Sequence, residues 1–187
     1  LGAIRTSGTV TVTGTAGNIT DATANEMGAS LNITGGTVIL LAGTGIGATG
    51  AVHDIDAAAT VLRTDSGIEG TYVTEADGVA LGDGTSGNTS TGPIVIAAGG
   101  AITTGNTVAT TANHAAIAIS TTAEGITLSN AVTAHGSGDV TLNADVETSD
   151  GLGGAGRGHI TIVAGRDVLQ NADILTAGTR SARLSRV

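Results

Sequence analysis

Short segments in which apolar and polar residues alternate recur along the whole chain, and most of them end at Gly, Asn or Asp. In the segment 125–128, for example, Ile126 and Leu128 point to one side of an extended chain while Thr127 points to the other. This period of two predicts half-buried β-strands, which are too short to form independent sheets. Further segments with this pattern are Thr9–Val12, Ser30–Ile33, Thr37–Leu40, Gly78–Leu81, Pro93–Ile96, Asp139–Leu142 and His159–Ile162.

These segments recur at loose intervals centred near 20 residues, which is the length of one coil of a solenoid. We therefore predict an all-β fold, a parallel β-helix (β-solenoid) of roughly nine coils of about 20 residues, forming a rod about 40 Å long. Residues 1–179 are expected to form one continuous solenoid. Residues 180–187 are an Arg-containing tail in which the pattern is lost, so that a cap, the start of another module and non-native sequence are three open interpretations.

Two stretches depart from the strand pattern. The Ala-rich stretch 51–62 is the best candidate for a helix, but His53, Asp54 and Asp56 interrupt it, so we expect no helix there. The Gly/Ser/Thr-rich stretch Gly82–Gly92 is interpreted as a corner loop rather than a linker, because strand-like segments flank it closely.

The composition agrees with a thin core. Gly, Thr and Ala (31, 32 and 30 residues) make up about half of the 187 residues, and Tyr72 is the only aromatic residue. A broad two-layer core would lack the aromatic side chains that fill such a core. In a solenoid, Gly is expected at the corners, Thr on the outer face of strands, and Ala with the aliphatic residues in a narrow lumen.

Charge limits the classes of partner. The chain has seven Arg, no Lys and a net charge of −9, which disfavours nucleic acid and anionic membrane surfaces as partners. It has no Cys, so a disulfide framework is excluded, and no apolar run of the length that a membrane span needs. The chain opens at Leu1 without a leader pattern, and we expect it to be a segment of a longer protein.

Two glycine motifs invite a cofactor interpretation. Gly45–Gly50 matches G-x-G-x-x-G, with Asp65 near the acidic position of a dinucleotide site, but no βαβ pattern surrounds it. Gly153–Ile160 is similar to the calcium-binding nonapeptide of β-rolls, but Gly158 stands where that repeat needs Asp. We predict no cofactor at either motif.

No catalytic, cofactor-binding or metal-binding residue is predicted. The four histidines stand at unequal offsets from the strands that follow them, so they are not expected to align; they are His53, His114, His135 and His159. Weak Ca²⁺ binding remains conceivable at two pairs of corner carboxylates, Asp54 with Asp56 and Asp145 with Glu147.

Two other function classes were weighed. A polysaccharide-degrading β-helix would use cationic groups or paired carboxylates together with sugar-stacking aromatics, and a chain with no Lys, Trp or Phe is poor in these. Ice or crystal-surface binding would require regular Thr-x-Thr ladders, and only Thr9–Thr13 has that form. Three N-glycosylation sequons begin at Asn18, Asn32 and Asn88, at a density that abundant Asn and Thr produce by chance.

The stretches GDVTLNADVETSDG (138–151), GRGHITIVAGRDVLQNADILTAGT (156–179) and GGAITTGNTVATT (99–111) resemble the repeats of filamentous-haemagglutinin-like secreted adhesins and related giant bacterial surface proteins. The resemblance covers most of residues 8–179 and is one of texture rather than of a catalytic signature. It implies a right-handed parallel β-helix that forms an extended stalk, exported by a Gram-negative secretion route and acting in attachment, aggregation or biofilm architecture. The secretion motifs expected at the amino terminus of such proteins are not present in this chain.

We therefore expect a structural, non-enzymatic solenoid segment of an exported bacterial surface adhesin or extracellular filament. Its partners would be neighbouring coils, identical subunits stacked end to end, and host or cell-surface glycans. A polysaccharide-binding or polysaccharide-degrading β-helix is the first alternative, and an ice- or surface-binding solenoid is the second.

Overall fold

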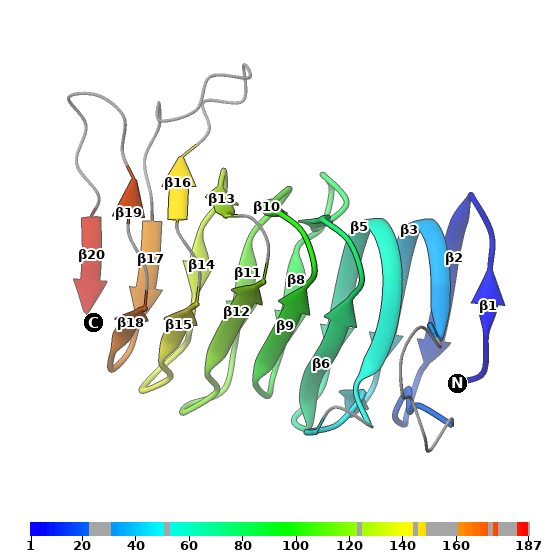
Figure 1. The fold of residues 1–187 in the computed structure, drawn as a ribbon. Coiled ribbons are helices and arrows are strands. Elements are labelled where there is room, and N and C mark those ends of the chain that lie inside the picture. Colours follow the sequence, from blue (N-terminus) through cyan, green and yellow to red (C-terminus); the bar gives the residue numbers. More distant parts are fainter. Residues whose placement is uncertain are drawn as a thin grey trace.

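Twenty short strands wind into a single parallel solenoid, and every strand pairing is with a strand of the preceding or following coil (Figure 1). The computed structural model describes residues 1–22, 31–50, 53–122, 125–143, 146–148, 161–171, 174–175 and 183–186. Among these residues there is no helix, and hence none that could span a membrane. Strands β1 and β20 lie at opposite ends of the rod.

The strands form three faces, which we call sheets 1, 2 and 3. Sheet 1 contains β1 (Ile4–Arg5), β4 (Gly45–Ile46), β6 (Gly70–Glu75), β9 (Ile94–Ala98), β12 (Ile117–Thr121), β15 (Val140–Leu142) and β18 (Val168–Gln170). Sheet 2 contains β2 (Thr9–Gly14), β7 (Val79–Leu81), β10 (Ile102–Thr104), β13 (Ile126–Leu128), β16 (Val146–Thr148) and β19 (Ile174–Leu175). Sheet 3 contains β8 (Asn88–Ser90), β11 (Val108–Thr110), β14 (Val132–Thr133), β17 (Thr161–Ala164) and β20 (Arg183–Arg186). The long strands β3 (Ile33–Ala42) and β5 (Ile55–Ser66) contribute to more than one face.

The β-solenoid prediction is confirmed, but the coils are longer and fewer than predicted. Ile94, Ile117 and Val140 are register partners 23 residues apart, and Ile102 and Ile126 are 24 apart. About six complete turns run from β4 to β20, preceded by the coils of β1, β2 and β3. The estimate of nine coils was wrong because the 14-residue spacing from Ile126 to Val140 joins two faces of the same winding rather than two successive coils.

The lumen is a stack of aliphatic side chains held in register. Ile94 lies against Ile117, and Ile96 against Ile119, which in turn lies against Leu142; all five are fully buried. Burying each such side chain contributes about 1.5–3 kcal/mol to stability. A coil alone could not bury them, so stacking and core formation are the same event.

The lumen also holds polar residues, which the expectation of Thr on outer faces missed. Asn88 and Ser90 form β8 inside the stretch predicted to be a corner loop, and both side chains are buried. The Asn88 carboxamide oxygen accepts from the backbone N–H of Thr64 at 2.7 Å and from its hydroxyl at 3.0 Å. Farther along, the buried Thr104 hydroxyl accepts from the N–H groups of Ser129 and Asn130 at 2.9 Å. These side chains supply partners for backbone groups where the coil turns.

Two stretches with an irregular pattern also form strands. The helix candidate 51–62 becomes part of β5, in which Ile55, Ala57 and Ala59 are buried in alternation. In the carboxy-terminal tail, Arg183–Arg186 form β20, which pairs in parallel with β17.

Glu75 is the one carboxylic acid among the described residues that is buried in the lumen, with 1% of its surface exposed. Its two carboxylate oxygens accept from the backbone N–H groups of Ala59 at 2.5 Å and Asp77 at 2.8 Å. None of the ion pairs among the described residues involves Glu75. Burial therefore outweighs the two hydrogen bonds and raises the pKa of Glu75 above its ordinary value.

The raised pKa of Glu75 makes this residue's contribution to stability depend on pH. The folded chain holds the proton more tightly than the unfolded chain, so the free energy of unfolding should rise as the pH falls through the folded-state pKa. The rise should level off below the ordinary carboxyl value of about 4.3. Denaturant titrations of the wild type and of Glu75→Gln across pH 4–8 measure this difference, which cancels the contributions of the other carboxylates. A difference that stays constant with pH would contradict the assignment.

Candidate functional site

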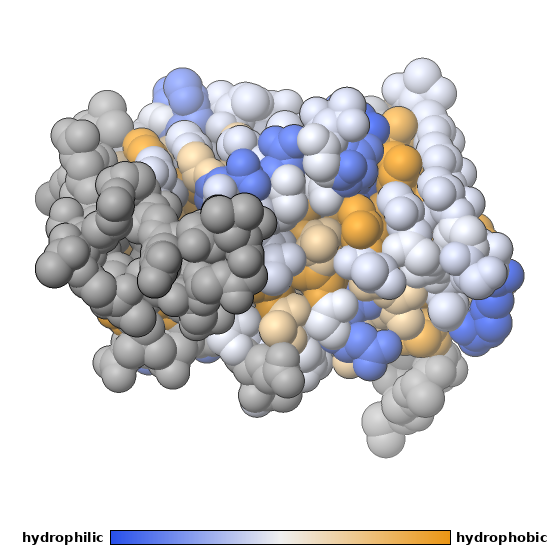
Figure 2. All heavy atoms as spheres, turned by 90° about the horizontal axis from the view of Figure 1, so that it is seen from above, coloured by the Kyte–Doolittle hydropathy of each residue, from blue (hydrophilic) through white to orange (hydrophobic). Residues whose placement is uncertain are grey.

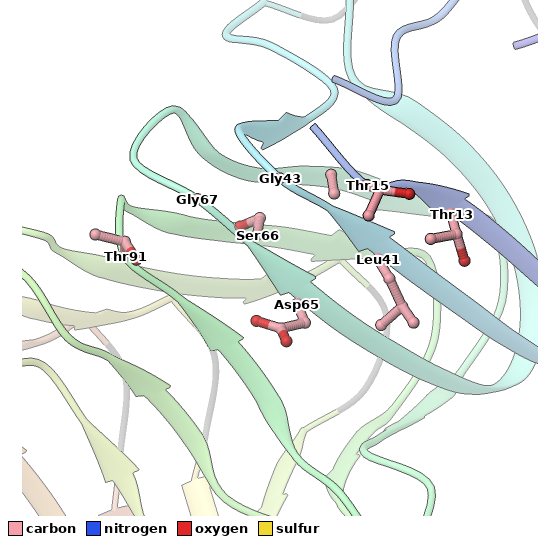
Figure 3. Close-up of a pocket in the computed structure, with 9 residues that line it drawn as sticks. Thr13, Thr15, Leu41, Gly43, Asp65, Ser66, Gly67 and Thr91 are labelled. Atoms are coloured by element: carbon pink, nitrogen blue, oxygen red, sulfur yellow. The ribbon is translucent and has the colours of Figure 1, made fainter. Parts of the chain in front are cut away.

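A shallow groove of about 380 Å³ lies at the corner where β2, β3 and β5 end (Figure 3). Thr13, Leu41 and Asp65 are register partners on these three strands and point to the same side. Gly43 and Gly67 follow in the next column, and Thr91 closes the groove beyond β8. The groove therefore runs along the rod axis across successive coils.

The floor of the groove is backbone, because the coils approach too closely there for side chains. A Cβ atom on Gly67 would lie well within 3 Å of the Gly43 carbonyl oxygen, and a Cβ on Gly43 would lie as close to the backbone of Thr15 and Ala16. Real Cβ atoms do not approach other atoms this closely, so these glycines are required by the stacking of coils.

The groove has hydrogen-bonding groups but little catalytic chemistry. The Asp65 carboxylate accepts from the Thr89 hydroxyl at 2.9 Å. The buried Ser66 hydroxyl is engaged with Thr71 and with Ser90, each at 2.8 Å. Asp65 is the one carboxylate among the described lining residues, whereas glycoside hydrolysis uses two carboxylates about 5–9.5 Å apart. The arrangement suits the binding of a neutral polar ligand better than acid–base catalysis.

The G-x-G-x-x-G motif does not begin a helix. Gly45 and Ile46 form β4, and the chain then leaves the sheet, with Gly47 (φ 63°) and Gly50 (φ 102°) in conformations that favour glycine. A dinucleotide site needs a helix N-terminus at the glycines, and none follows in the described residues. Asp65 lies in the corner groove instead.

The described histidines are separated. His53 lies beside the second half of the loop that begins at Gly47, and the His114 Nδ1 atom lies 2.6 Å from the Ser137 hydroxyl near a corner. His135 is placed by a backbone hydrogen bond, its N–H donating to the buried Thr110 hydroxyl. Where the structure describes the chain, no group of three or more His, Asp or Glu residues could hold a metal ion.

The other candidates divide between described and undescribed parts. Asp54 accepts a hydrogen bond from the Thr74 hydroxyl, and Asp56 lies in register with Thr74. The motif Gly153–Ile160, with His159, lies outside the described residues, as do Asp145 and the Glu147 side chain.

The three sequons differ in exposure. Asn18 is exposed, and its amide donates to the Glu69 carboxylate at 2.6 Å. Asn32 and Asn88 are buried, with 1% and 0% of their surfaces exposed, and both are hydrogen-bonded inside the coil. Of the three, only Asn18 is accessible in the folded chain.

The Thr ladder of β2 ends after one coil. Thr9 lies in register with Thr37, but Thr11 and Thr13 are followed by Ile39 and Leu41. A flat double file of hydroxyls therefore does not extend along the face.

Sequence reasoning missed both the corner groove and the surroundings of Tyr72. The groove is formed by residues 24 to 28 apart, and finding it requires the true register. Tyr72 lies on the outer face of β6 beside Val95, which is 36% exposed. The signal that could have identified this place is the uneven spacing of apolar residues between Ile46 and Ile55.

Comparisons with protein-family models, with curated proteins and with solved structures each found no match to this chain. The β-solenoid architecture therefore stands on the strand register itself. The resemblance to filamentous-haemagglutinin-like adhesins gains no support from these comparisons.

We expect Gly67→Ala to destabilise the chain by about 2 kcal/mol or more, because the new Cβ would collide with a backbone oxygen that cannot move without separating two coils. Gly17→Ala is the matched control: nothing lies within 4 Å of a Cβ at that position, and its effect should stay within about 0.5 kcal/mol. Urea unfolding of the two variants measures the difference. Equal stabilities would show that the coils are not in close contact at the groove floor.

Proposed function

We propose that this chain is a structural rod segment of a larger exported bacterial surface adhesin or extracellular filament. The observation that carries the proposal is the continuity of the coil, in which strands from β2 to β20 continue the same faces with every pairing parallel. Such a fold converts chain length directly into rod length at about 4.8 Å for each coil. The proposal assigns the chain a mechanical role and no reaction.

The surface supports an extracellular, repetitive role. Figure 2 shows one face on which hydrophobic residues form narrow strips between white and blue polar residues. The net charge of −9 and the absence of Lys and Cys are shared with the adhesin repeats that the sequence resembles. A net charge of this size favours solubility over non-specific association.

The ends of the rod suggest the partner. The outer edge of β2 carries unpaired backbone groups along Thr9–Gly14, since the described pairing of this strand is on the β3 side. An open strand edge favours pairing with another strand. In a longer protein the neighbouring coils would cover such edges, and in a filament an identical subunit stacked end to end would do so.

The corner groove favours one alternative, a polysaccharide-binding solenoid. Exposed Thr hydroxyls and the Asp65 carboxylate line a groove that follows the rod axis, which suits a neutral glycan lying along the rod. Cell-surface or host glycans would be the ligands in that case. The rod role and glycan binding at the groove are compatible with each other.

The rod proposal is tested by holding the chain at its two ends and unfolding it by force. We expect stepwise release of coils of about 24 residues, each adding about 80 Å of extended chain, because each coil contacts only its neighbours. Deleting residues 94–116 removes one full coil and places Ile117 on Thr71 in the register that Ile94 now occupies. This variant should fold and unfold at the same force as the wild type.

The matched control deletes residues 94–105, about half a coil, which shifts later strands to the wrong face and should prevent folding. Failure of the full-coil deletion to fold, or unfolding of the wild type at negligible force, would overturn the structural role. Depolymerisation of a polysaccharide by the purified chain would favour the enzymatic alternative instead.

A further inference from the structure

The coil is interrupted opposite its only aromatic residue. Ile46 pairs with Thr71 and Ile55 pairs with Val73, so eight residues of the preceding coil, 47–54, stand opposite Tyr72 alone. On the other side Tyr72 has an ordinary register partner, Val95. In solenoids, insertions of this kind project from one face, which is often the binding face.

Hydrogen bonds and a close backbone approach fix the described part of this insertion. The Ala48 N–H donates to the His53 carbonyl at 2.8 Å, and the His53 N–H donates to the Gly50 carbonyl at 2.9 Å. Gly47 has a positive φ of 63°, and a Cβ there would collide with the Tyr72 carbonyl oxygen and the Asp54 backbone. Glycine at position 47 thus lets the insertion lie against β6.

The insertion and the outer face of sheet 1 enclose a pocket of about 200 Å³. Its walls include Tyr72, Val95 and Ala97 from β6 and β9, together with Ala48 and Asp54 from the insertion. The lining is mostly apolar, with Asp54 as its charged group among the described residues. The volume is that of a small organic group rather than of a nucleotide or an oligosaccharide.

The carboxylate of Asp54 has an unused acceptor. One oxygen, Oδ2, accepts from the Thr74 hydroxyl, while Oδ1 is shielded from water and meets no donor among the described residues. A buried carboxylate oxygen without a donor is costly, and a ligand that brings a charged donor relieves that cost. Burial also raises the pKa of Tyr72, so its phenol stays neutral and offers a π face to a cation.

We propose that this pocket binds an alkylammonium or guanidinium group, with Asp54 accepting its N–H groups and Tyr72 and Val95 covering its apolar stem. The negative net charge of the chain favours a cation over an anion at this place. The cation has two conceivable sources with the same chemistry, a free organic amine and a Lys or Arg side chain of a partner protein. This inference is independent of the proposed rod role.

Tyr72 provides the readout, because the chain contains one Tyr and no Trp. Butylammonium chloride added to the full chain should change the tyrosine fluorescence saturably. NaCl at equal ionic strength and n-butanol, which has the same apolar stem without the charge, should not do so. Saturation by n-butanol at the same concentration, or no response to butylammonium, would overturn the proposal.

Variants separate the charge from the pocket. Asp54→Asn should weaken butylammonium binding about tenfold or more, the effect of losing one charge-assisted contact. Asp65→Asn makes the same charge change in the corner groove and should leave binding unchanged. Ala97→Leu keeps Asp54 but fills the pocket, and it should also abolish the response. Circular dichroism confirms that each variant is folded, and equal binding by wild type and Asp54→Asn would contradict the assignment.

A second titration identifies the source of the cation. The peptide Gly-Gly-Lys-Gly-Gly, with blocked ends, should compete with butylammonium if a side chain of a partner protein is the natural ligand. Binding of butylammonium without binding of the peptide supports a free amine. Both outcomes support cation recognition at Asp54, whereas peptide binding that survives Asp54→Asn would contradict it.

Discussion

The structure depends on parallel backbone pairing between successive coils, because a single coil can neither pair its own strands nor bury its own apolar side chains. Each step of 23 or 24 residues returns the chain to the same face and places Ile94 on Thr71 and Ile117 on Ile94. The lumen is filled by aliphatic side chains from all three faces, and its narrow section explains the near absence of aromatic residues. The close approach of coils at Gly43 and Gly67 is a second consequence of the same pairing.

The same pairing decides where polar groups are needed and where variation is tolerated. At the corners the chain turns away from the sheets, and buried side chains such as Thr104 and Asn88 satisfy backbone groups there. Outside the lumen nothing in the pairing restricts side-chain chemistry. Both hollows of the surface therefore lie on the outside of the coil, the groove at Asp65 at a corner and the pocket at Tyr72 beneath an insertion.

The class of fold could be predicted from sequence because alternation such as Ile126-Thr127-Leu128 is a local property of one strand. The coil length could not, because Val140 follows Ile126 on the next face and both faces carry the same pattern. Buried Asn88 and Ser90 were hidden for a related reason: their hydrogen-bond partners lie 24 residues away, and locally they resemble loop residues. The Tyr72 pocket depends on an interruption in the neighbouring coil, which becomes visible once the register is known.

The register itself is most directly tested by disulfide formation, since the chain contains no Cys. Val95 and Ala118 are register partners on the outer face of sheet 1, at a Cα separation of about 4.8 Å that a disulfide can span. Ala97 and Ala118 would be partners if a coil had 21 residues, but with 23 they are diagonal neighbours about 8 Å apart, beyond disulfide reach. The account predicts rapid oxidation of the Val95→Cys/Ala118→Cys variant and slow oxidation of Ala97→Cys/Ala118→Cys. The reverse order would contradict the 23-residue coil.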